Sequence, residues 1–331
     1  MMDVLEFERQ IAEMERMIAE LKQPARRDEA AKQGIDAEAE VAKLEAQVRA
    51  AIEGYFSRLS PWEKTQIARH KDRPYTLDYV RLVFEEFLEL QGDRLAGNDE
   101  AVVGGPAWLE GAPVMVIGQQ KGRDIKERQR RNFGSARAEG FRKALRLAGL
   151  AEKFGLPLVS FVDTAGAAAD LLAEERGVSE AIARNLREFA RLRVPTVAIV
   201  IGEGGSGGAL AVAVADRVLM LEHAIYSVIS PEGCAAILWR DREQAPRAAE
   251  ALRLTAQDAL RMGLVDGIVP EPLGGAHRDV VAAAESVKRA IEESLAALRG
   301  LSGQELVERR YQRLRSIGVW REEPATQPPA D

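Results

Sequence analysis

Residues 194–215 read VPTVAIVIGEGGSGGALAVAVA and contain the strongest structural signal in the chain. The first eight of these residues form a short apolar run, which indicates a buried strand. The run breaks at Gly202, passes through a glycine-rich turn and resumes at Ala209 as a small-residue helix candidate. Glycine lets a ligand approach the backbone, and the first turn of a helix leaves N–H groups without intrahelical partners. The junction therefore suits an oxyanion, although a tight turn that needs glycine only for packing has the same pattern.

Strand and helix candidates alternate on both sides of this junction. The strand candidates cover 112–118, 156–163, 217–221 and 225–230, and helix candidates cover 138–154, a segment ending at Arg191 and a segment beginning at Pro231. Strands separated by helices indicate an α/β fold with a parallel sheet. In such folds ligands gather where strands end and helices begin, so we expect the loops after the strands to share one end of the sheet.

Composition limits the function classes. The chain has 331 residues, a formal net charge of -6 at pH 7 and one cysteine, Cys234. The negative charge argues against nucleic acid as the main partner, and the basic run KERQRR at 126–131 is typical of a solvated helix face. One cysteine excludes an internal disulfide and a multi-cysteine zinc site. No apolar stretch reaches the length of a membrane span and no charged-then-apolar leader is present, so we expect a cytoplasmic location.

Two amphipathic patterns precede the alternating region. Apolar residues recur at three- and four-residue steps over 3–22 and again over 36–58, while 24–34 is polar and turn-prone. Two such helices predict a hairpin that either docks a partner or a second copy, or covers the core of its own domain. We therefore expect an N-terminal helical arm over 1–72, one α/β domain over 73–318 and a disordered tail over 319–331.

The segment 255–270, TAQDALRMGLVDGIVP, predicts a capped helix, a glycine stop and a short strand. This ending resembles the crotonase superfamily, which also contains the Clp protease fold. The resemblance implies a spiral of repeated strand-strand-helix (ββα) units. In that superfamily, paired backbone N–H groups stabilise an enolate of an acyl-coenzyme A or a related anion.

Nine further strings are similar to one family of that superfamily, the alpha subunits of bacterial acetyl-coenzyme A carboxylase carboxyltransferase. They are RPYTLDY at 73–79, KGR at 121–123, RRNFG at 130–134, AEERG at 173–177, SEAIARNL at 179–186, GEGGSGGAL at 202–210, YSVISPEGC at 226–234, PEPLGGAH at 270–277 and RRYQRL at 309–314. The resemblance runs from the first helix to about Gly318.

The resemblance implies half of an active site. The family transfers a carboxyl group from carboxybiotin on a carrier protein to acetyl-coenzyme A, which yields malonyl-coenzyme A in the first committed step of fatty acid biosynthesis. The implied partners are a beta subunit in an α2β2 assembly, the biotin carboxyl carrier protein and acetyl-coenzyme A. Biotin arrives on the carrier as the carboxyl donor. No cofactor or metal is expected on this chain, and the zinc ribbon belongs to the beta subunit.

The resemblance also implies the site residues. The alpha side is expected to face biotin, and the backbone N–H groups of Gly207 and Gly208 would hold the ureido oxygen as biotin loses its carboxyl group. The residues expected to line the substrate site are Gly204, Gly205, Ser206, Gly166, Ala167, Ser230 and Gly233.

Two departures from the family fall near this site. The family follows its strand with Asp-Thr-Pro-Gly-Ala-Tyr-Pro-Gly, whereas residues 163–172 read DTAGAAADLL. The loss of prolines and glycines predicts a looser or partly helical loop, and it brings Asp170 and Leu172 near biotin. Gln119 stands where the family has histidine. Either the biotin pocket is lined differently, or the chain is a diverged copy with weakened catalysis.

Three alternatives remain open. The alternatives to a carboxyltransferase subunit are a noncatalytic scaffold of the same complex, a self-contained crotonase-type acyl-coenzyme A enzyme and a Clp-like serine hydrolase. The hydrolase would need a triad drawn from Ser206, Ser230, His223 and Asp163. His70 and His277 are expected at the surface or an interface rather than as metal ligands, and Cys234 as a buried residue at a helix start. A malonyl-coenzyme A assay with a beta partner and biotinylated carrier separates these functions.

Overall fold

The computed structural model describes residues 5–24 and 36–318. Most of the predicted turn over 24–34 and the whole predicted tail over 319–331 lie outside the described residues. Within the described part, no helix combines the length and the apolar character needed to cross a lipid bilayer.

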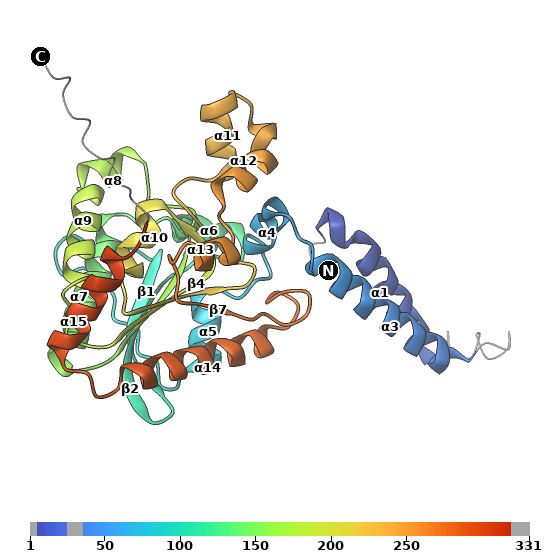
Figure 1. Ribbon diagram of the computed structural model, residues 1–331, viewed down its shortest axis with the longest axis horizontal. Helices are drawn as coiled ribbons and strands as arrows, with labels where there is room; N and C mark the ends of the chain where they lie inside the picture. Colours follow the sequence, from blue (N-terminus) through green and yellow to red (C-terminus); the bar gives the residue numbers. More distant parts are fainter. Residues whose placement is uncertain (1–4, 25–35, 319–331) are drawn as a thin grey trace, which may run out of the picture.

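A seven-stranded sheet forms the centre of the molecule (Figure 1). The strands are β1 (Val102–Leu109), β2 (Ala112–Gln119), β3 (Leu158–Thr164), β4 (Thr196–Gly205), β5 (Arg217–Leu221), β6 (Ile225–Ser227) and β7 (Gly267–Val269). Their order is β1-β2-β3-β4-β5-β7, with β6 paired to the far end of β4. Only the β1–β2 pair is antiparallel. The predicted parallel α/β sheet is therefore confirmed.

Helices cover both faces of the sheet. The helices after the N-terminal pair are α4 (Pro61–Ala68), α5 (Thr76–Val83), α6 (Ile125–Arg130), α7 (Ala138–Phe154), α8 (Leu171–Glu175), α9 (Val178–Phe189), α10 (Ser206–Ala213), α11 (Pro231–Trp239), α12 (Ala245–Leu252), α13 (Ala256–Arg261), α14 (Val280–Leu298) and α15 (Gly303–Arg315). Of these, α11 and α12 extend away from the sheet (Figure 1). Gly104 faces Leu147 of α7, whereas Gly118 faces Thr76 of α5. Because Gly104 pairs with Ile117, the neighbour of Gly118, these two helices lie on opposite faces.

Strand β4 is longer than predicted. The sequence prediction ended this strand at Ile201, but pairing continues to Gly205 because Glu203 to Gly205 form a ladder with β6. Conversely, β6 ends at Ser227 and not at residue 230. Half of the glycine-rich stretch is thus strand, and the helix follows without an intervening loop.

The N-terminal helices form an arm with its own small core. Helix α1 (Arg9–Leu21) and helix α3 (Ala37–Phe56) pack their apolar stripes against each other. The buried residues of this cluster are Ile11, Ile18, Val41, Val48, Ile52, Phe56 and Ile67. Figure 1 shows the pair extending away from the α/β body. This arrangement favours the docking-arm interpretation over a cover for the main core, while the domain boundaries stay a prediction.

Candidate functional site

The ends of four strands gather at one edge of the sheet, as predicted. Strand β2 ends at Gln119, β3 at Thr164, β4 at Gly205 and β6 at Ser227. Neighbours among β2, β3 and β4 are parallel, and β6 is parallel to β4, so their carboxyl ends point the same way. This edge is where α/β folds bind ligands.

The junction between β4 and α10 presents backbone donors. Gly205 occupies the N-cap position of α10, and no side chain caps this helix. The N–H groups of its first turn, Ser206 to Gly208, have no intrahelical acceptor. Ser206 has a φ of 52°, a left-handed conformation that costs energy for a residue with a side chain. An uncapped helix start and a strained backbone together mark this turn as a candidate site for an anion.

Glycine is needed at this turn for packing, but not at every position. A Cβ on Gly208 would lie 2.5 Å from the Ala167 nitrogen, and one on Gly205 would lie 2.2 Å from the Ala165 oxygen. A Cβ on Gly207 would instead meet only the Ile182 side chain, at 3.7 Å. Close packing therefore explains Gly205 and Gly208, but Gly207 has room for a side chain and needs another explanation.

The loop after β3 lies against the same turn. Gly166 has a φ of 153°, and its N–H donates to the Thr164 hydroxyl at 3.1 Å. That hydroxyl donates in turn to the Gly166 carbonyl at 2.7 Å. The tight turn brings the backbone of Gly166 and Ala167 beside Gly208. The structure thus brings together two of the predicted segments, 166–167 and 204–208.

A largely apolar cavity of about 420 Å³ opens beside the turn. It is lined by Ser206, Gly207, Leu210, Ala213, Val214, Val218, Tyr226, Ser227, Val228, Leu252, Arg253, Met262, Leu264, Arg313, Leu314 and Ile317. Burial raises the pKa of Tyr226 to about 12, so its phenol is neutral near pH 7. The cavity shares Ser206 and Gly207 with the first turn of α10, and its apolar lining suits an uncharged part of a ligand.

Two predicted site residues serve a different helix. The Ser230 hydroxyl accepts a hydrogen bond from the Gly233 N–H at 3.1 Å and caps the start of α11. Neither residue is among those that line the cavity. The structure therefore brings them to each other rather than to the β4–α10 junction.

A buried group of charges lies at the ends of β2, β3 and β4. The Lys121 Nζ atom is 2.8 Å from Asp163 and 2.9 Å from Glu203, and Arg69 contacts Glu203 at 2.6 Å. Burial opposes charge on Lys121, but the two carboxylates outweigh it and raise its pKa. Burial likewise raises the pKa of Glu203, but Lys121 and Arg69 reverse the effect and lower it to about 2. Lys121, Arg69 and Glu203 are therefore ionised near pH 7, and the carboxylate of Glu203 is shared between the two cationic side chains.

The sequence interpretation did not identify this charge cluster. Lys121, Asp163 and Glu203 are far apart in the chain, but each lies at the carboxyl end of a predicted strand. Neighbouring parallel strands end at the same edge of a sheet, so the position of these three residues at strand ends could have predicted that they lie close together.

The altered loop contains the capped start of helix α8. Asp170 accepts a hydrogen bond from the Ala173 N–H at 2.8 Å and caps α8. Its carboxylate also pairs with Arg137 at 2.6 Å, and this hydrogen bond lowers the pKa of Asp170. The partly helical loop that the sequence predicted is confirmed. The Asp170 charge is balanced by Arg137, and Leu172 is 40% exposed.

The geometry does not assemble a hydrolase triad. Asp163 is engaged by Lys121 and by the Glu203 N–H, and Ser230 caps α11. His223 is buried against Phe56, with the ring centroids 5.6 Å apart. Over residues 5–24 and 36–318, no hydrogen bond joins His223 to Ser206 or Ser230.

His70 and His277, which were expected at the surface or an interface, do not lie at the surface. Both residues are buried, and their rings lie 4.2 Å apart. The His277 Nε2 atom is 3.5 Å from a Glu8 carboxylate oxygen, which Arg278 also approaches at 3.3 Å. The Nδ1 atom of His70 accepts the Asp72 N–H at 3.2 Å. The group anchors the arm to the loop before α14, a tertiary contact that neither histidine's neighbours in sequence could indicate.

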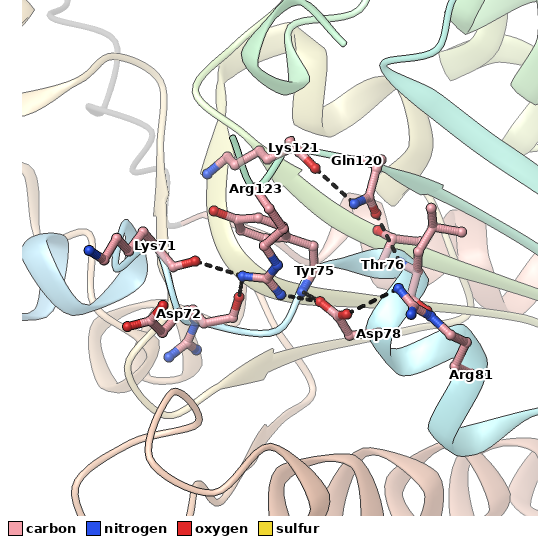
Figure 2. Close-up of polar contacts among 12 residues, drawn as sticks. Lys71, Asp72, Tyr75, Thr76, Asp78, Arg81, Gln120, Lys121 and Arg123 are labelled. Carbon is pink, nitrogen blue, oxygen red and sulfur yellow. Dashed lines mark hydrogen bonds and ion pairs between the residues drawn. The ribbon is translucent and has the colours of Figure 1, made fainter. Parts of the chain in front are cut away.

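Two of the family strings meet beside the charge cluster (Figure 2). Arg123 donates to the carbonyls of Lys71 and Arg73 at 2.6 and 2.9 Å and pairs with Asp78. Its guanidinium also lies over the Tyr75 ring, 4.0 Å from the centroid. RPYTLDY and KGR, far apart in the chain, therefore form one structural unit that supports the end of β2.

Known relatives share almost the whole sequence. Residues 4–318 match the family described as Acetyl co-enzyme A carboxylase carboxyltransferase-like. The acetyl-coenzyme A carboxylase carboxyl transferase subunit alpha of Idiomarina loihiensis is 54% identical over 96% of this chain and 99% of that protein. The subunit of the same name from Thermus thermophilus is 53% identical over 96% of this chain and 99% of that protein.

Solved structures share the fold at low identity. A transcarboxylase 12S structure with methylmalonyl-coenzyme A bound has a TM-score of 0.55 and 18% identity, and covers 77% of this chain and 44% of that one. A Pseudomonas malonate decarboxylase hetero-tetramer with coenzyme A has a TM-score of 0.55 and 20% identity, and covers 67% of this chain and 89% of that one. This likeness confirms the crotonase-like α/β fold. With the family model and the near-full-length relatives, it follows that the chain belongs to the acetyl-coenzyme A carboxylase carboxyltransferase family.

Proposed function

We propose that this chain is the alpha subunit of an acetyl-coenzyme A carboxylase carboxyltransferase. It contributes to the transfer of a carboxyl group from carboxybiotin to acetyl-coenzyme A, which forms malonyl-coenzyme A. The observation that carries the site assignment is the uncapped start of α10, which lies against the 166–167 backbone and opens into an apolar cavity. The relatives, similar over nearly their full length, support the reaction.

The chemical role of the site follows from its donors. When biotin gives up its carboxyl group, negative charge develops on the ureido oxygen. The N–H groups of Gly207 and Gly208 would hold that oxygen, and fixed donors of this kind stabilise charge without reorganising during the reaction. Removing one donor from such a site typically lowers the rate by about 10²–10³.

The residues around these donors have supporting roles in the proposal. Gly205 and Gly208 let the 165–167 backbone approach, and Gly204, Ser206, Gly166 and Ala167 complete the wall. The apolar cavity beside Gly207 would take the uncharged body of biotin. Ser230 and Gly233 remain predicted substrate contacts, although in this structure they cap α11. The Asp170–Arg137 pair supports a reshaped biotin wall rather than a degraded one, because the carboxylate has a partner.

Partners complete the proposed enzyme. A beta subunit of the same fold would supply the acetyl-coenzyme A side of the cleft and the zinc ribbon, in an α2β2 assembly. The carrier protein would deliver biotin. Val228, which lines the cavity beside the junction and is 74% exposed, supports a protein contact there. The expected cytoplasmic location stays a prediction.

Reconstitution tests this function. The purified chain is mixed with a beta subunit of the family, acetyl-coenzyme A and carboxylated biotin carrier, and malonyl-coenzyme A is measured. We expect turnover from the pair and none from this chain alone. Activity from the lone chain would favour a self-contained crotonase. A correctly assembled pair without turnover would favour the noncatalytic scaffold.

A further inference from the structure

One buried side chain joins the two backbone segments of the candidate site. The Gln119 Nε2 atom donates to the Gly208 carbonyl at 2.7 Å, and its Oε1 atom accepts the Asp163 N–H at 3.0 Å. Gln119 is fully buried, with 0% exposure. Only this orientation of the amide satisfies both partners, since the opposite one would set donor against donor and acceptor against acceptor.

We propose that Gln119 is a positioning residue, which fixes the first turn of α10 relative to the end of β3. This inference rests on the proposed function of the turn. Gln119 does not touch substrate in the proposal. It acts through Gly208 on one side and through Asp163, which precedes the Thr164–Gly166 turn, on the other.

The glycine turn needs such a restraint. Residues 202–208 contain five glycines, which leave the backbone with few side-chain contacts to hold it. A displacement of about 1 Å in a catalytic group lowers a rate by up to about a hundredfold. The backbone of Gln119 is itself held, because the Thr76 hydroxyl donates to the main-chain carbonyl of Gln119. The restraint therefore runs from α5 through β2 to α10.

A neutral amide suits this position for an electrostatic reason. Asp163, whose N–H bonds Gln119, belongs to the charge cluster with Glu203, Lys121 and Arg69, in which two carboxyl side chains face two cationic ones. An extra carboxylate or imidazolium at residue 119 would disturb that balance. Glutamine also supplies one donor and one acceptor at every pH, so its two hydrogen bonds do not titrate.

Two substitutions therefore predict opposite pH profiles in the assembled carboxyltransferase. In Gln119→Glu, the ionised carboxylate accepts the hydrogen bond from the Asp163 N–H but has no proton to donate to the Gly208 carbonyl. Protonation restores the donor, so the activity relative to wild type should rise as pH falls. In Gln119→His, the neutral ring offers one donor and one acceptor, and protonation turns the acceptor into a second donor. Its relative activity should fall as pH drops through about 6.5.

The substitutions should change kcat rather than KM, because Gln119 does not touch substrate in the proposal. At the pH where each substituted side chain is in its unfavourable form, we expect kcat to fall by about ten- to hundredfold with little change in KM. Gln120→Glu is the matched control. Gln120 is a buried neighbouring amide, whose two side-chain hydrogen bonds go to the Leu77 N–H and the Lys121 carbonyl and not to α10. Figure 2 shows its position beside Lys121 and Thr76. This control should show no change in the slope of the kcat profile.

Amide hydrogen exchange provides a readout that does not depend on the reaction. In Gln119→Met, which removes both hydrogen bonds at similar volume, exchange should increase at Asp163 and in the first turn of α10. Unchanged exchange there, or parallel pH profiles for the glutamate and histidine variants, would overturn the positioning role. A different outcome would separate the two proposals. If exchange increases in Gln119→Met but the wild-type chain, correctly assembled with its beta subunit, transfers no carboxyl group, the proposed function is refuted and the restraint by Gln119 still stands.

Discussion

Two helices begin at the same edge of the sheet, and they begin differently. Helix α11 starts with Ser230, whose hydroxyl accepts the Gly233 N–H, and Pro231 follows at a position where no N–H is needed. Helix α10 starts at Gly205 with no side-chain cap, and Ser206 adopts a left-handed conformation. The first start is built for stability. In the proposed function the second leaves its backbone donors to a bound anion, so the capped turn serves its helix and the uncapped turn is the candidate binding turn.

The largest expected effect comes from closing the α10 turn. Gly208→Ala places a Cβ 2.5 Å from the Ala167 nitrogen, so the backbone must move and the donors move with it. We expect kcat for carboxyl transfer in the assembled enzyme to fall by about a hundredfold or more. Gly207→Ala is the comparison variant at the other proposed donor, and we expect a smaller loss, because its Cβ meets only the Ile182 side chain at 3.7 Å and the backbone need not move. Equal losses in both variants would show that crowding at Gly208 is not what matters.

Removing a charge beneath the turn should reduce stability. Glu203→Gln leaves Lys121 and Arg69 short of a carboxylate partner, and we expect the free energy of unfolding at pH 7 to drop by about 3 kcal/mol. The pKa of Glu203 is lowered to about 2 in the folded chain, from an ordinary value of 4.5. Its contribution is therefore complete above about pH 4.5 and is lost as the pH falls towards 2. Denaturant titrations should show the difference between wild type and variant shrinking over that interval, whereas a constant difference would contradict the assignment.

The capped helix start should respond in stability and not in rate. Ser230→Ala removes the cap of α11, and we expect a loss of about 1 kcal/mol in the free energy of unfolding with kcat unchanged. A rise in KM for the biotin donor would show that Ser230 also binds substrate.

Ser206→Ala should change the rate of carboxyl transfer only slightly, because the proposed donors are backbone groups. Abolished activity in Ser206→Ala would replace the oxyanion account with a nucleophilic one.

The smallest expected effect comes from restoring the family sequence of the altered loop. The family pattern is restored by Ala165→Pro, Ala168→Tyr, Ala169→Pro, Asp170→Gly and Leu172→Gly. We expect unchanged or lower turnover, because Ala168 is buried and Asp170 both caps α8 and pairs with Arg137. Turnover with free biotin decides the matter, since a gain of tenfold or more would identify the native loop as degraded.

Local patterns in the sequence were enough for several elements. Helix α7 and strand β5 have the predicted bounds, and Thr255 caps α13 through the Asp258 N–H as its spacing indicated. In each case the signal is contained in a few neighbouring residues, such as an apolar period, a β-branched run or a capping pair.

Contacts between distant segments explain what was missed. Strand β1 contains two glycines and a proline, so its composition does not indicate a strand. It forms because it pairs with β2 on one side and with the segment that contains Leu88 on the other. At Gly105 that segment leaves no space, since a Cβ would lie 1.8 Å from the Leu88 oxygen. The glycines that weaken the local signal are required by this tertiary approach.

The site shows the same division. The glycine turn was predicted from its own residues, whereas the role of Gln119 depends on Gly208 and Asp163, which lie 89 and 44 positions away. The sequence marked Gln119 only as a departure from the family. Its two hydrogen bonds show what the glutamine does in the fold, since they connect the first turn of α10 to the end of β3.

The most direct test of the central claim is a structure of the assembled carboxyltransferase with biotin bound. We expect the ureido oxygen about 2.9 Å from the backbone nitrogens of Gly207 and Gly208, with the biotin ring in the cavity beside Leu210. This expectation would be contradicted by a ureido oxygen held elsewhere on the two subunits while both N–H groups of the α10 turn contact only water.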